Sequence, residues 1–209
     1  MFGDVGATSR FLVEQLESVL KQPLQNGAYF SKDAYVEDGG IEMLHMSDAF
    51  YEVVIRGNLK QVICSADEYK KYRISEKDIL IARRSLNYEG AAKPCLIPPS
   101  PNPLIFESSF IRVTPNPEKV GFLFFFHYLS NDWVRQKCIK PFLTQSTISG
   151  INQSNLARVP VLTPPLRLQQ EFARRVEAID RLKNTHRESL TQLDALFASL
   201  QHRAFRGEL

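Results

Sequence analysis

The stretch TPPLRLQQEFARRVEAIDRL, Thr163 to Leu182, places two prolines directly before a segment that runs to Phe205 without another proline or any glycine. Proline cannot continue a preceding helix, but its fixed φ suits the first turn of a new one. The stretch therefore predicts a long helix that begins near Pro165, and Gly207 supplies a stop after it. At about 1.5 Å per residue, roughly forty residues would extend about 60 Å, more than a domain of this size needs for its own core.

Apolar residues along this segment recur at alternating steps of three and four, which is the seam of a coiled coil. Lys183 and His186 are two polar breaks in the seam, and such breaks set register and orientation at some cost in stability. A partner helix is therefore expected, although an amphipathic helix can instead cover its own domain, and His186 can be an ordinary edge residue. The seam residues predicted to contact the partner helix are Phe172, Val176, Ile179, Leu190, Leu193, Phe197 and Leu200.

The chain before Pro160 has a different pattern, with short elements separated by turns. A helix is expected between Pro117 and Lys140, ending before Pro141. The predicted fold class is α+β: a mixed α/β globular domain, residues 1–160, is followed by a long C-terminal coiled-coil helix, residues 161–209. β-branched and aromatic residues predict strands at Glu52 to Ile55, Gln61 to Cys64, Asp78 to Ala82, Leu104 to Phe106 and Phe110 to Val113.

The composition fits one ordinary core, since 44% of the 209 residues are hydrophobic and 11% are aromatic. The longest apolar cluster, GFLFFFHYL, is too short for a membrane span of about 20 residues, and the N-terminus shows no secretion signal, so a cytoplasmic location is expected. Cys64, Cys95 and Cys138 are widely spaced and odd in number, which predicts buried free thiols in place of a disulfide framework or a zinc site.

The charge is unevenly distributed, although the net formal charge is only +3. Residues 1–55 hold three basic and nine acidic residues, whereas residues 56–158 hold fifteen basic and eight acidic residues. The middle of the chain can therefore present a surface that attracts phosphate. An evenly solvated lysine-rich surface would have the same composition.

Motifs for catalysis are weak. The sequence has no glycine-rich phosphate loop, H-E-x-x-H or G-x-S-x-G motif, its four histidines lack metal-ligand spacing, and no metal site is predicted. Asp48, Glu68 and Lys70 follow the order that some metal-dependent nucleases use, but such a triplet is common by chance. Asn102-Pro103 only superficially resembles the N-P-P-Y loop of amine methyltransferases. No catalytic residue is predicted.

Polar and basic clusters suggest nucleic-acid binding. Arg83 and the residues after it directly follow a predicted strand, so guanidinium and amide groups can project toward base edges. A second polar loop spans Gln145 to Gln153. The candidates for phosphate contact are Lys60, Lys70, Lys71, Arg73, Lys93, Lys137 and Lys140. Each side chain alone could be an ordinary solvated residue. The predicted DNA-binding residues are Arg83, Arg84, Ser85, Asn87, Tyr88, Lys93, Gln145, Ser146, Thr147, Asn152, Lys60 and Lys71.

Several stretches resemble the specificity subunit of type I restriction-modification systems. ISEKDILIARRS and ESSFIRVTPNPEKVGFLFFFHYLSN are similar to strand-loop and strand-helix segments of that family. The strongest resemblance runs from TQSTISGINQSNLARVPVLTPPLRLQQEFARRVEAIDRL to LDALFASLQHRAFRGEL, which is similar to the family's double proline, spacer helix and A-F-x-G-E-L ending. Family members usually carry two target-recognition domains and two spacer helices, whereas one of each is found here.

The resemblance implies a non-catalytic subunit that reads one half of a bipartite target on double-stranded DNA, while its helix sets the spacing of the half-sites and docks methyltransferase subunits. It implies no cofactor on this chain, with S-adenosylmethionine, ATP and Mg²⁺ in the methyltransferase and restriction subunits. The chain is then either a half subunit that forms a homodimer through its C-terminal helix or part of a longer chain. The alternatives are a coiled-coil scaffold that does not read DNA and, least favoured, a nuclease that uses Asp48, Glu68 and Lys70.

Overall fold

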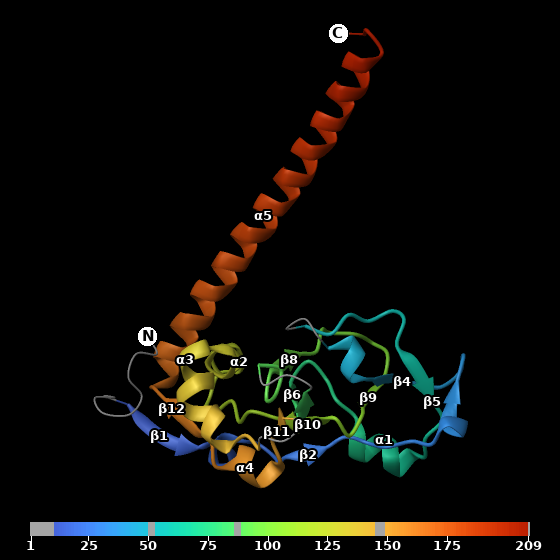
Figure 1. Cartoon of the computed structure of the whole chain (residues 1–209). Coiled ribbons are helices and arrows are strands. Elements are labelled where there is room, and N and C mark those ends of the chain that lie inside the picture. The colour runs from blue at the N-terminus through green and yellow to red at the C-terminus, as the bar shows by residue number, and fades with distance from the viewer. Residues whose placement is uncertain (1–10, 50–52, 86–88, 145–148, 209) are drawn as a thin grey trace. The chain divides into compact units, whose positions relative to one another are not determined.

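The structure is a computed structural model that describes residues 11–49, 53–85, 89–144 and 149–208 (Figure 1). The chain divides into two compact units, residues 1–166 and 167–209. The first unit combines short strands and helices, and a single long helix occupies the second. The predicted α+β class, with a long C-terminal helix, is confirmed.

Two four-stranded sheets form the centre of the first unit. One is antiparallel, with the order β2 (Gln25–Asn26), β10 (Phe110–Val113), β6 (Ile79–Ala82) and β8 (Pro94–Leu96). The other has the order β3 (Tyr35–Val36), β5 (Lys60–Val62), β4 (Ile41–Leu44) and β9 (Leu104–Phe106), in which β4 and β9 are parallel.

Two small sheets complete the strand pairing. Strand β1 (Leu12–Gln15) pairs with β12 (Pro160–Thr163), so the first unit continues past the domain boundary expected at residue 160. Strand β7 (Arg84–Ser85) pairs with β11 (Ser149–Gly150). The second pair is important because it lies within the segments predicted to contact DNA.

The core lies along β6 and β10, in which every residue is buried. A strand buried on both faces is a central strand, and this explains the continuous apolar run Ile79–Ala82. Arg112 of β10 is buried like its neighbours but is the one charged residue in these two strands. Its guanidinium donates to the Arg73 carbonyl at 2.9 Å and to Gln25 Oε1 at 3.0 Å. Burial lowers the pKa of Arg112 from its ordinary value.

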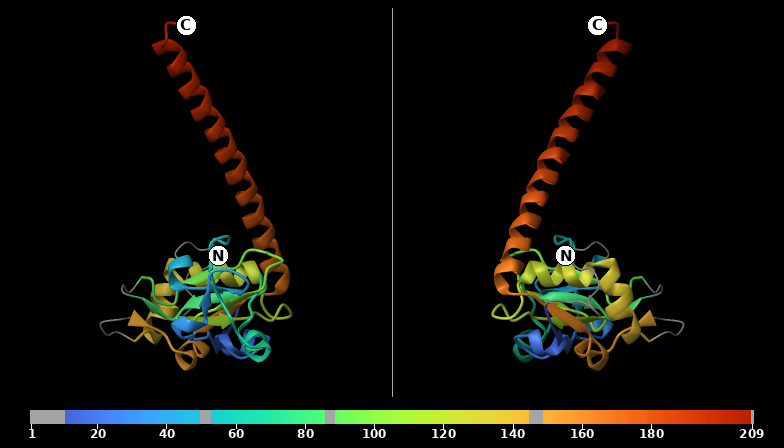
Figure 2. Two further views of the ribbon diagram at one scale, coloured as in Figure 1. Left: turned by 90° about the vertical axis from the view of Figure 1, so that its right-hand side faces the viewer. Right: turned by 90° about the vertical axis from the view of Figure 1, so that its left-hand side faces the viewer.

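Short helices surround the sheets. Helix α2 (Phe122–Ser130) carries five buried aromatic and aliphatic side chains and packs near β8 (Figure 2). The bounds are η1 (Leu16–Val19), η2 (Lys32–Ala34), η3 (Met46–Asp48), α1 (Ala66–Tyr72), α2 (Phe122–Ser130), α3 (Asp132–Val134), η4 (Arg135–Ile139), η5 (Lys140–Phe142) and α4 (Gln153–Ala157).

The single helix predicted between Pro117 and Lys140 is wrong in its continuity. Asn131 has extended backbone angles and its side chain accepts a hydrogen bond from the Val134 amide at 3.2 Å, which ends α2 and starts α3. Asparagine favours such caps over helix interiors. A π-helical segment, η4, follows α3, and Pro141 lies inside η5 instead of beyond the helical region.

The strands predicted at Leu104 to Phe106 and Phe110 to Val113 are confirmed, and the strand predicted at Asp78 to Ala82 is β6, which begins one residue later at Ile79. The two other strand predictions need correction. In the segment Glu52 to Ile55, residue 52 is outside the described residues, and Val53 forms only an isolated bridge with Leu96. The Val54 amide donates to the Leu96 carbonyl at 2.9 Å, and Val54 is buried in the core. The strand predicted at Gln61 to Cys64 ends at Val62, because Ser65 already caps α1.

All three cysteines are free, as predicted. Cys95 and Cys138 are buried, but Cys64 is partly exposed, so the prediction of three buried thiols is wrong for Cys64. Burial raises the pKa of the Cys95 thiol to about 12.

Helix α5 (Leu166–Phe205) forms the second unit, begins directly after Pro165 and is continuous through Asn184. At its end the Glu208 amide donates to the Arg203 carbonyl at 2.9 Å, and the Gly207 amide donates to the Ala204 carbonyl at 3.1 Å. Gly207 has a φ of 73°, so it supplies the left-handed residue that this stop requires. Among the described residues, no helix is long and apolar enough to span a membrane.

Candidate nucleic-acid interface

Two polar segments that are far apart in the sequence meet at the small sheet of β7 and β11. The strands pair antiparallel, with Arg84 opposite Gly150. Each strand belongs to one of the two segments that the sequence marks as candidate DNA contacts. The structure therefore brings these segments together at one place, which their separation in the sequence did not predict.

Gly150 makes this close approach possible. The Ile151 amide donates to the Arg83 carbonyl at 2.9 Å, and a Cβ at Gly150 would lie 2.7 Å from the same carbonyl oxygen. On its other side, Gly150 exchanges two hydrogen bonds with Thr144, at 2.9 and 3.1 Å. A side chain at this position would therefore force the two polar segments apart.

Arg83 and Arg84 differ in their surroundings. The Arg83 amide donates to the Ser109 carbonyl at 2.7 Å, and its Nη1 donates to the Ser108 carbonyl at 3.3 Å, so the partly buried Arg83 is anchored to the turn before β10. The side chain of Arg84 is exposed. Because Arg83 is held by the Ser108 carbonyl and the Arg84 side chain is exposed, Arg84 is better placed than Arg83 to meet a ligand.

Asn152 has a structural role in the second segment. It is the N-cap of α4, where its Oδ1 accepts from the Asn155 amide at 2.7 Å. Ser85 lies in β7 and is partly exposed. The other predicted residues of the two loops, Asn87, Tyr88, Gln145, Ser146 and Thr147, are outside the described residues.

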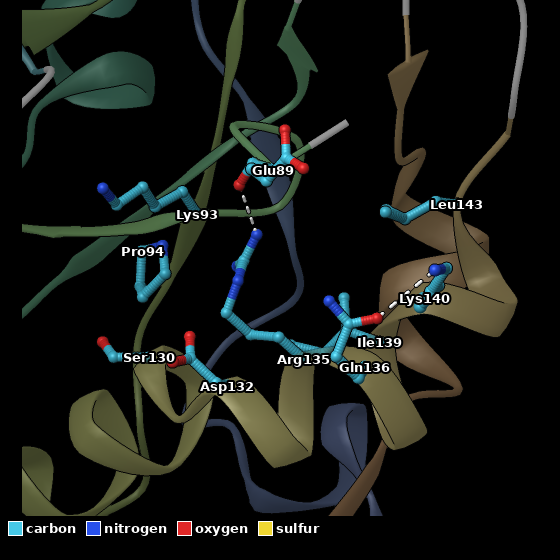
Figure 3. Close-up of a pocket in the computed structure, with 10 residues that line it drawn as sticks. All are labelled: Glu89, Lys93, Pro94, Ser130, Asp132, Arg135, Gln136, Ile139, Lys140 and Leu143. Carbon is cyan, nitrogen blue, oxygen red and sulfur yellow. Dashed lines mark hydrogen bonds between the residues drawn. The ribbon is translucent and has the colours of Figure 1, made fainter. Parts of the chain in front are cut away.

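A polar pocket of about 260 Å³ lies beside these segments (Figure 3). Lys93 lines it from the end of the first segment, and Lys140 and Leu143 line it from the stretch that leads into the second. Both lysines are exposed. The pocket thus brings together Lys93 and Lys140, two of the candidates for phosphate contact, and it lies next to the residues that flank both loops.

The remaining predicted lysines lie elsewhere in the first unit. Lys60 is on β5 and Lys71 is in the last turn of α1, and both are exposed. The Nζ atom of Lys71 lies 5.1 Å from the centre of the Tyr72 ring. These two residues belong to the sheet of β3, β5, β4 and β9 and its helix, not to the sheet of β7 and β11.

Arg135 was missed as a candidate from the sequence. Its guanidinium donates to the backbone carbonyls of Glu89, Ala91 and Ala92, in the turn near the end of the first polar segment, at 2.7, 2.9 and 2.9 Å. Figure 3 shows this side chain reaching from the helix toward Glu89. The carbonyls are more than forty residues away in sequence, so no local pattern around Arg135 could have identified the role.

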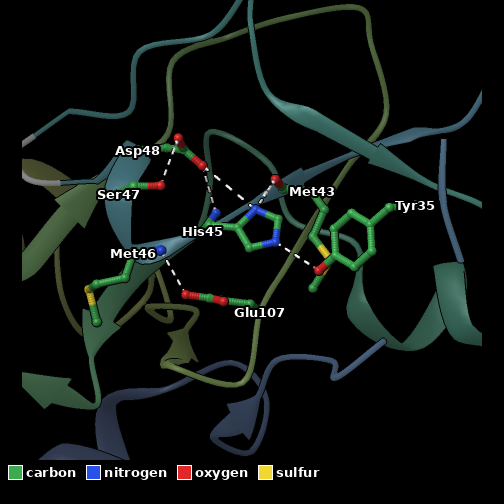
Figure 4. Close-up of polar contacts among 7 residues, drawn as sticks. All are labelled: Tyr35, Met43, His45, Met46, Ser47, Asp48 and Glu107. Atoms are coloured by element: carbon green, nitrogen blue, oxygen red, sulfur yellow. Dashed lines mark hydrogen bonds and ion pairs between the residues drawn. The ribbon is translucent and has the colours of Figure 1, made fainter. Parts of the chain in front are cut away.

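The two acidic residues of the nuclease alternative serve as local caps, and Lys70 lies in the last turn of α1. Asp48 Oδ2 accepts from the His45 amide at 2.8 Å, and His45 Nε2 lies 2.9 Å from the Tyr35 hydroxyl (Figure 4). Glu68 Oε2 accepts from the amide and the hydroxyl of Ser65 at 2.8 Å each, and these hydrogen bonds lower the pKa of Glu68. Within the described part of the chain, no group of three or more histidines, cysteines or acidic residues could hold a metal ion.

Known proteins with similar sequences are specificity subunits. The chain is 28% identical to the type I restriction enzyme StySPI specificity subunit of Salmonella potsdam, over 81% of this chain and 37% of that protein. It is 27% identical to the EcoKI specificity subunit of Escherichia coli K12, over 92% of this chain and 42% of that protein. The chain thus spans less than half the length of these relatives.

Solved structures share the fold. The HsdS subunit from Thermoanaerobacter tengcongensis matches with a TM-score of 0.63 and 17% identity, over 99% of this chain and 48% of that one. A chain from a type I restriction-modification complex matches with a TM-score of 0.65 and 16% identity, over all of this chain and 49% of that one. The family model for the type I restriction modification DNA specificity domain matches residues 11–194. With so much of its length covered, the chain belongs to the type I restriction modification DNA specificity domain family.

Proposed function

We propose that this chain is the DNA-reading part of a type I restriction-modification complex and reads one half of a bipartite target on double-stranded DNA. The observation that carries the proposal is the pairing of β7 with β11, which places two polar segments side by side. We refer to residues 83–93 and 144–153 together as the loop pair. Family membership supports this reading, because each protein named above is a specificity subunit or part of a type I system.

The chemistry of the loop pair suits a DNA groove. An arginine can bind a guanine edge through two hydrogen bonds, and an asparagine or glutamine can bind adenine in the same way. Arg84 is exposed at the strand end, and Asn87 and Gln145 are predicted contacts in the same segments. Lys93 and Lys140 then bind phosphates, which fixes the position of the domain without reading sequence.

The C-terminal helix supports pairing with a second copy of this chain. The part of the seam from Phe172 to Phe197 is symmetric about the point between Asn184 and Thr185, so an antiparallel pair centred there places apolar residues beside apolar residues and polar beside polar. The matched layers are Phe172 with Phe197, Val176 with Leu193, Ile179 with Leu190, and Lys183 with His186.

Charges beside the seam fit the same register. Asp180 and Arg187 each follow a seam residue directly, so they lie on the same flank of the helix. In the antiparallel pair, each Asp180 comes within one helical turn of Arg187 of the second copy. A homodimer would thereby carry two loop pairs, one for each half-site, at a separation set by the paired helices. In a longer chain, a second helix of the same chain would take this place.

Chemistry on the DNA belongs to other subunits in this proposal. Methyltransferase subunits that bind S-adenosylmethionine modify the target, and a restriction subunit that uses ATP and Mg²⁺ cuts foreign DNA. This chain holds no cofactor. A scaffold that assembles partners through α5 without reading DNA is the second candidate, and the exposed apolar seam of α5 is the observation that favours it.

DNA selection distinguishes these candidates. We expect the purified chain to enrich a defined half-site from duplexes of random sequence, and its affinity to fall steeply as salt rises from about 50 to 200 mM because phosphate contacts release counterions. A chain that enriches no sequence and shows no salt-dependent binding would be the scaffold.

Gly150→Ala tests the observation that carries the proposal. The added methyl group meets the Arg83 carbonyl, so the two segments separate and the preference for the selected half-site falls. Gly40→Ala is the matched control, because a Cβ there would also crowd a backbone carbonyl, that of Val62 at 2.9 Å, but beside β5 and away from β7 and β11. Equal loss of preference in both variants would contradict the role of the β7–β11 pair.

A further inference from the structure

We propose that Arg135 is a positioning residue for DNA recognition, which holds the turn where the first segment of the loop pair returns to the sheet. This inference rests on the proposed function. It adds a residue outside both polar segments, on a different element, to the recognition machinery.

The contacts of Arg135 converge on one turn. Its Nη2 donates to the carbonyls of Glu89 and Ala91 at 2.7 and 2.9 Å, and its Nη1 donates to the carbonyl of Ala92 at 2.9 Å. The planar guanidinium presents donors in a fixed fork, whereas a lysine ammonium is a single point of charge. A lysine ammonium also has three donors, but they share one nitrogen, whereas the guanidinium spreads its donors over several nitrogens in a fixed plane.

The turn needs such support because its backbone is unusual. Ala92 has a φ of 57°, a left-handed conformation that residues other than glycine, asparagine and aspartate rarely adopt. Ala91 and Ala92 are fully buried, and buried carbonyls need hydrogen-bond partners. The guanidinium satisfies carbonyls that would otherwise have to turn toward water, and this stabilises the left-handed turn.

The turn closes the first segment at its base. The Ala92 amide donates to the Ala82 carbonyl at 2.8 Å, and the Ala82 amide donates to the Lys93 carbonyl at 2.9 Å. The segment that begins with Arg83 and Arg84 therefore leaves and rejoins the sheet at one point. Movement of the turn would therefore disturb the end of β6 and, directly after it, Arg83 and Arg84.

The element that carries Arg135 also supports the second segment. Arg135 opens η4, a π-helical stretch, and its amide donates to the Asn131 carbonyl at 2.8 Å. Such stretches are rare and often occur at functional sites. The chain continues through η5 to Thr144, which pairs with Gly150, and the Phe142 carbonyl accepts from Asn155 at 2.9 Å. One stretch of about ten residues therefore anchors both segments.

Arg112 offers a matched control. It also donates from its guanidinium to backbone carbonyls, those of Lys71 and Arg73 at the end of α1, but it does so away from the loop pair. If Arg135 only stabilised the fold, replacing either arginine would have the same consequences for DNA binding.

The experiment compares Arg135→Met, Arg135→Lys and Arg112→Met in the full chain. For each variant we measure the thermal midpoint, the hydrogen exchange of the Ala82, Ala92 and Lys93 amides without DNA, and the ratio of affinities for the selected and a scrambled duplex. We expect Arg135→Met to accelerate exchange at these amides and to lower the affinity ratio about tenfold, the effect of one misplaced base contact. Arg135→Lys should show a smaller loss, and Arg112→Met should lower the thermal midpoint while keeping the ratio.

Unchanged exchange at the three amides in a folded Arg135→Lys and Arg135→Met chain would overturn the inference while leaving the proposed function intact. An equal loss of the affinity ratio in Arg112→Met would overturn it as well, because the effect would then follow from stability alone. A wild-type chain that discriminates no sequence would overturn the proposed function first.

Discussion

The first unit buries most of its large apolar side chains, whereas helix α5 exposes most of its own. In the first unit Phe106 and Phe110 are at most 1% exposed, whereas Leu193 and Phe197 of α5 are 61% and 62% exposed. The first unit has a core of its own that folding buries. The helix carries a regular apolar seam that pairing with another helix would bury. In the proposed pair, folding and assembly are therefore encoded in separate parts of the chain, and each can be perturbed alone.

The largest expected effect comes from a charge in the seam. Leu193→Asp removes an apolar layer twice in a symmetric pair, and since burying a leucine contributes about 1.5 to 3 kcal/mol, the pair should weaken by about 3 to 6 kcal/mol. Sedimentation equilibrium would show a dimer becoming a monomer at micromolar concentration, with the thermal midpoint of the first unit unchanged. Gln192→Asp on the neighbouring, polar face is the control. If both variants pair equally well, the seam is not the interface.

A core substitution gives the converse result. Phe110→Ala removes a buried ring from β10 and should lower the free energy of unfolding by about 3 to 5 kcal/mol. Phe205→Ala is the control, because that side chain is 89% exposed near the end of α5. Denaturant unfolding followed by near-ultraviolet circular dichroism measures the difference. Comparable losses in the two variants would mean that the helix end shares the core, contrary to the division into two units.

The same division explains which features the sequence predicted. Helix α5 and the strands Leu104–Phe106 and Phe110–Val113 follow from local signals, namely heptad spacing, flanking prolines, a terminal glycine and β-branched runs. The break at Asn131 is also a local cap, but the apolar residues on both sides obscured it. The single bridge at Val53 depends on pairing with β8, which no local pattern specifies.

The candidate site was less predictable than the fold for a similar reason. Composition and strand-end position identified both polar segments, but their pairing through Gly150 and their support by Arg135 involve residues more than forty positions apart. A glycine within a polar loop is a weak signal, because it becomes informative only when the facing carbonyl is known. Arg83 and Asn152 stay predicted DNA contacts, and each makes a structural contact that only the fold reveals.

Arg84 and Arg83 provide a finer test within the first unit. Arg84→Ala should reduce specific binding by about 1 to 3 kcal/mol, the contribution of one bidentate base contact, with little change in stability. Arg83→Ala instead removes a hydrogen bond to the Ser108 carbonyl and should cost about 1 kcal/mol of unfolding free energy. Titration of the selected duplex and denaturant unfolding separate the two effects. Arg84→Ala with unchanged affinity and discrimination would remove Arg84 from the interface.

The smallest expected effect is a difference in the reactivity of the three thiols, which changes the free energy of unfolding little. Alkylation requires a thiolate, and burial raises the pKa of Cys95 to about 12, so this thiol stays protonated at pH 8. Iodoacetamide should therefore modify the partly exposed Cys64 first and reach Cys95 and Cys138 only after unfolding, as intact mass spectrometry would show.

The contribution of Cys95 to the stability of the fold depends on pH. The unfolded chain ionises its thiols near the ordinary pKa of about 8.5, whereas folded Cys95 resists ionisation up to about pH 12, so its contribution to stability is complete below the first value and is lost as pH rises toward the second.

Residues 161–209 contain no cysteine, so all three thiols report on the first unit. Labelling rates should consequently be the same in wild type and Leu193→Asp. Faster labelling of Cys95 in that variant would mean that pairing of the helix stabilises the core, and that folding and assembly are coupled.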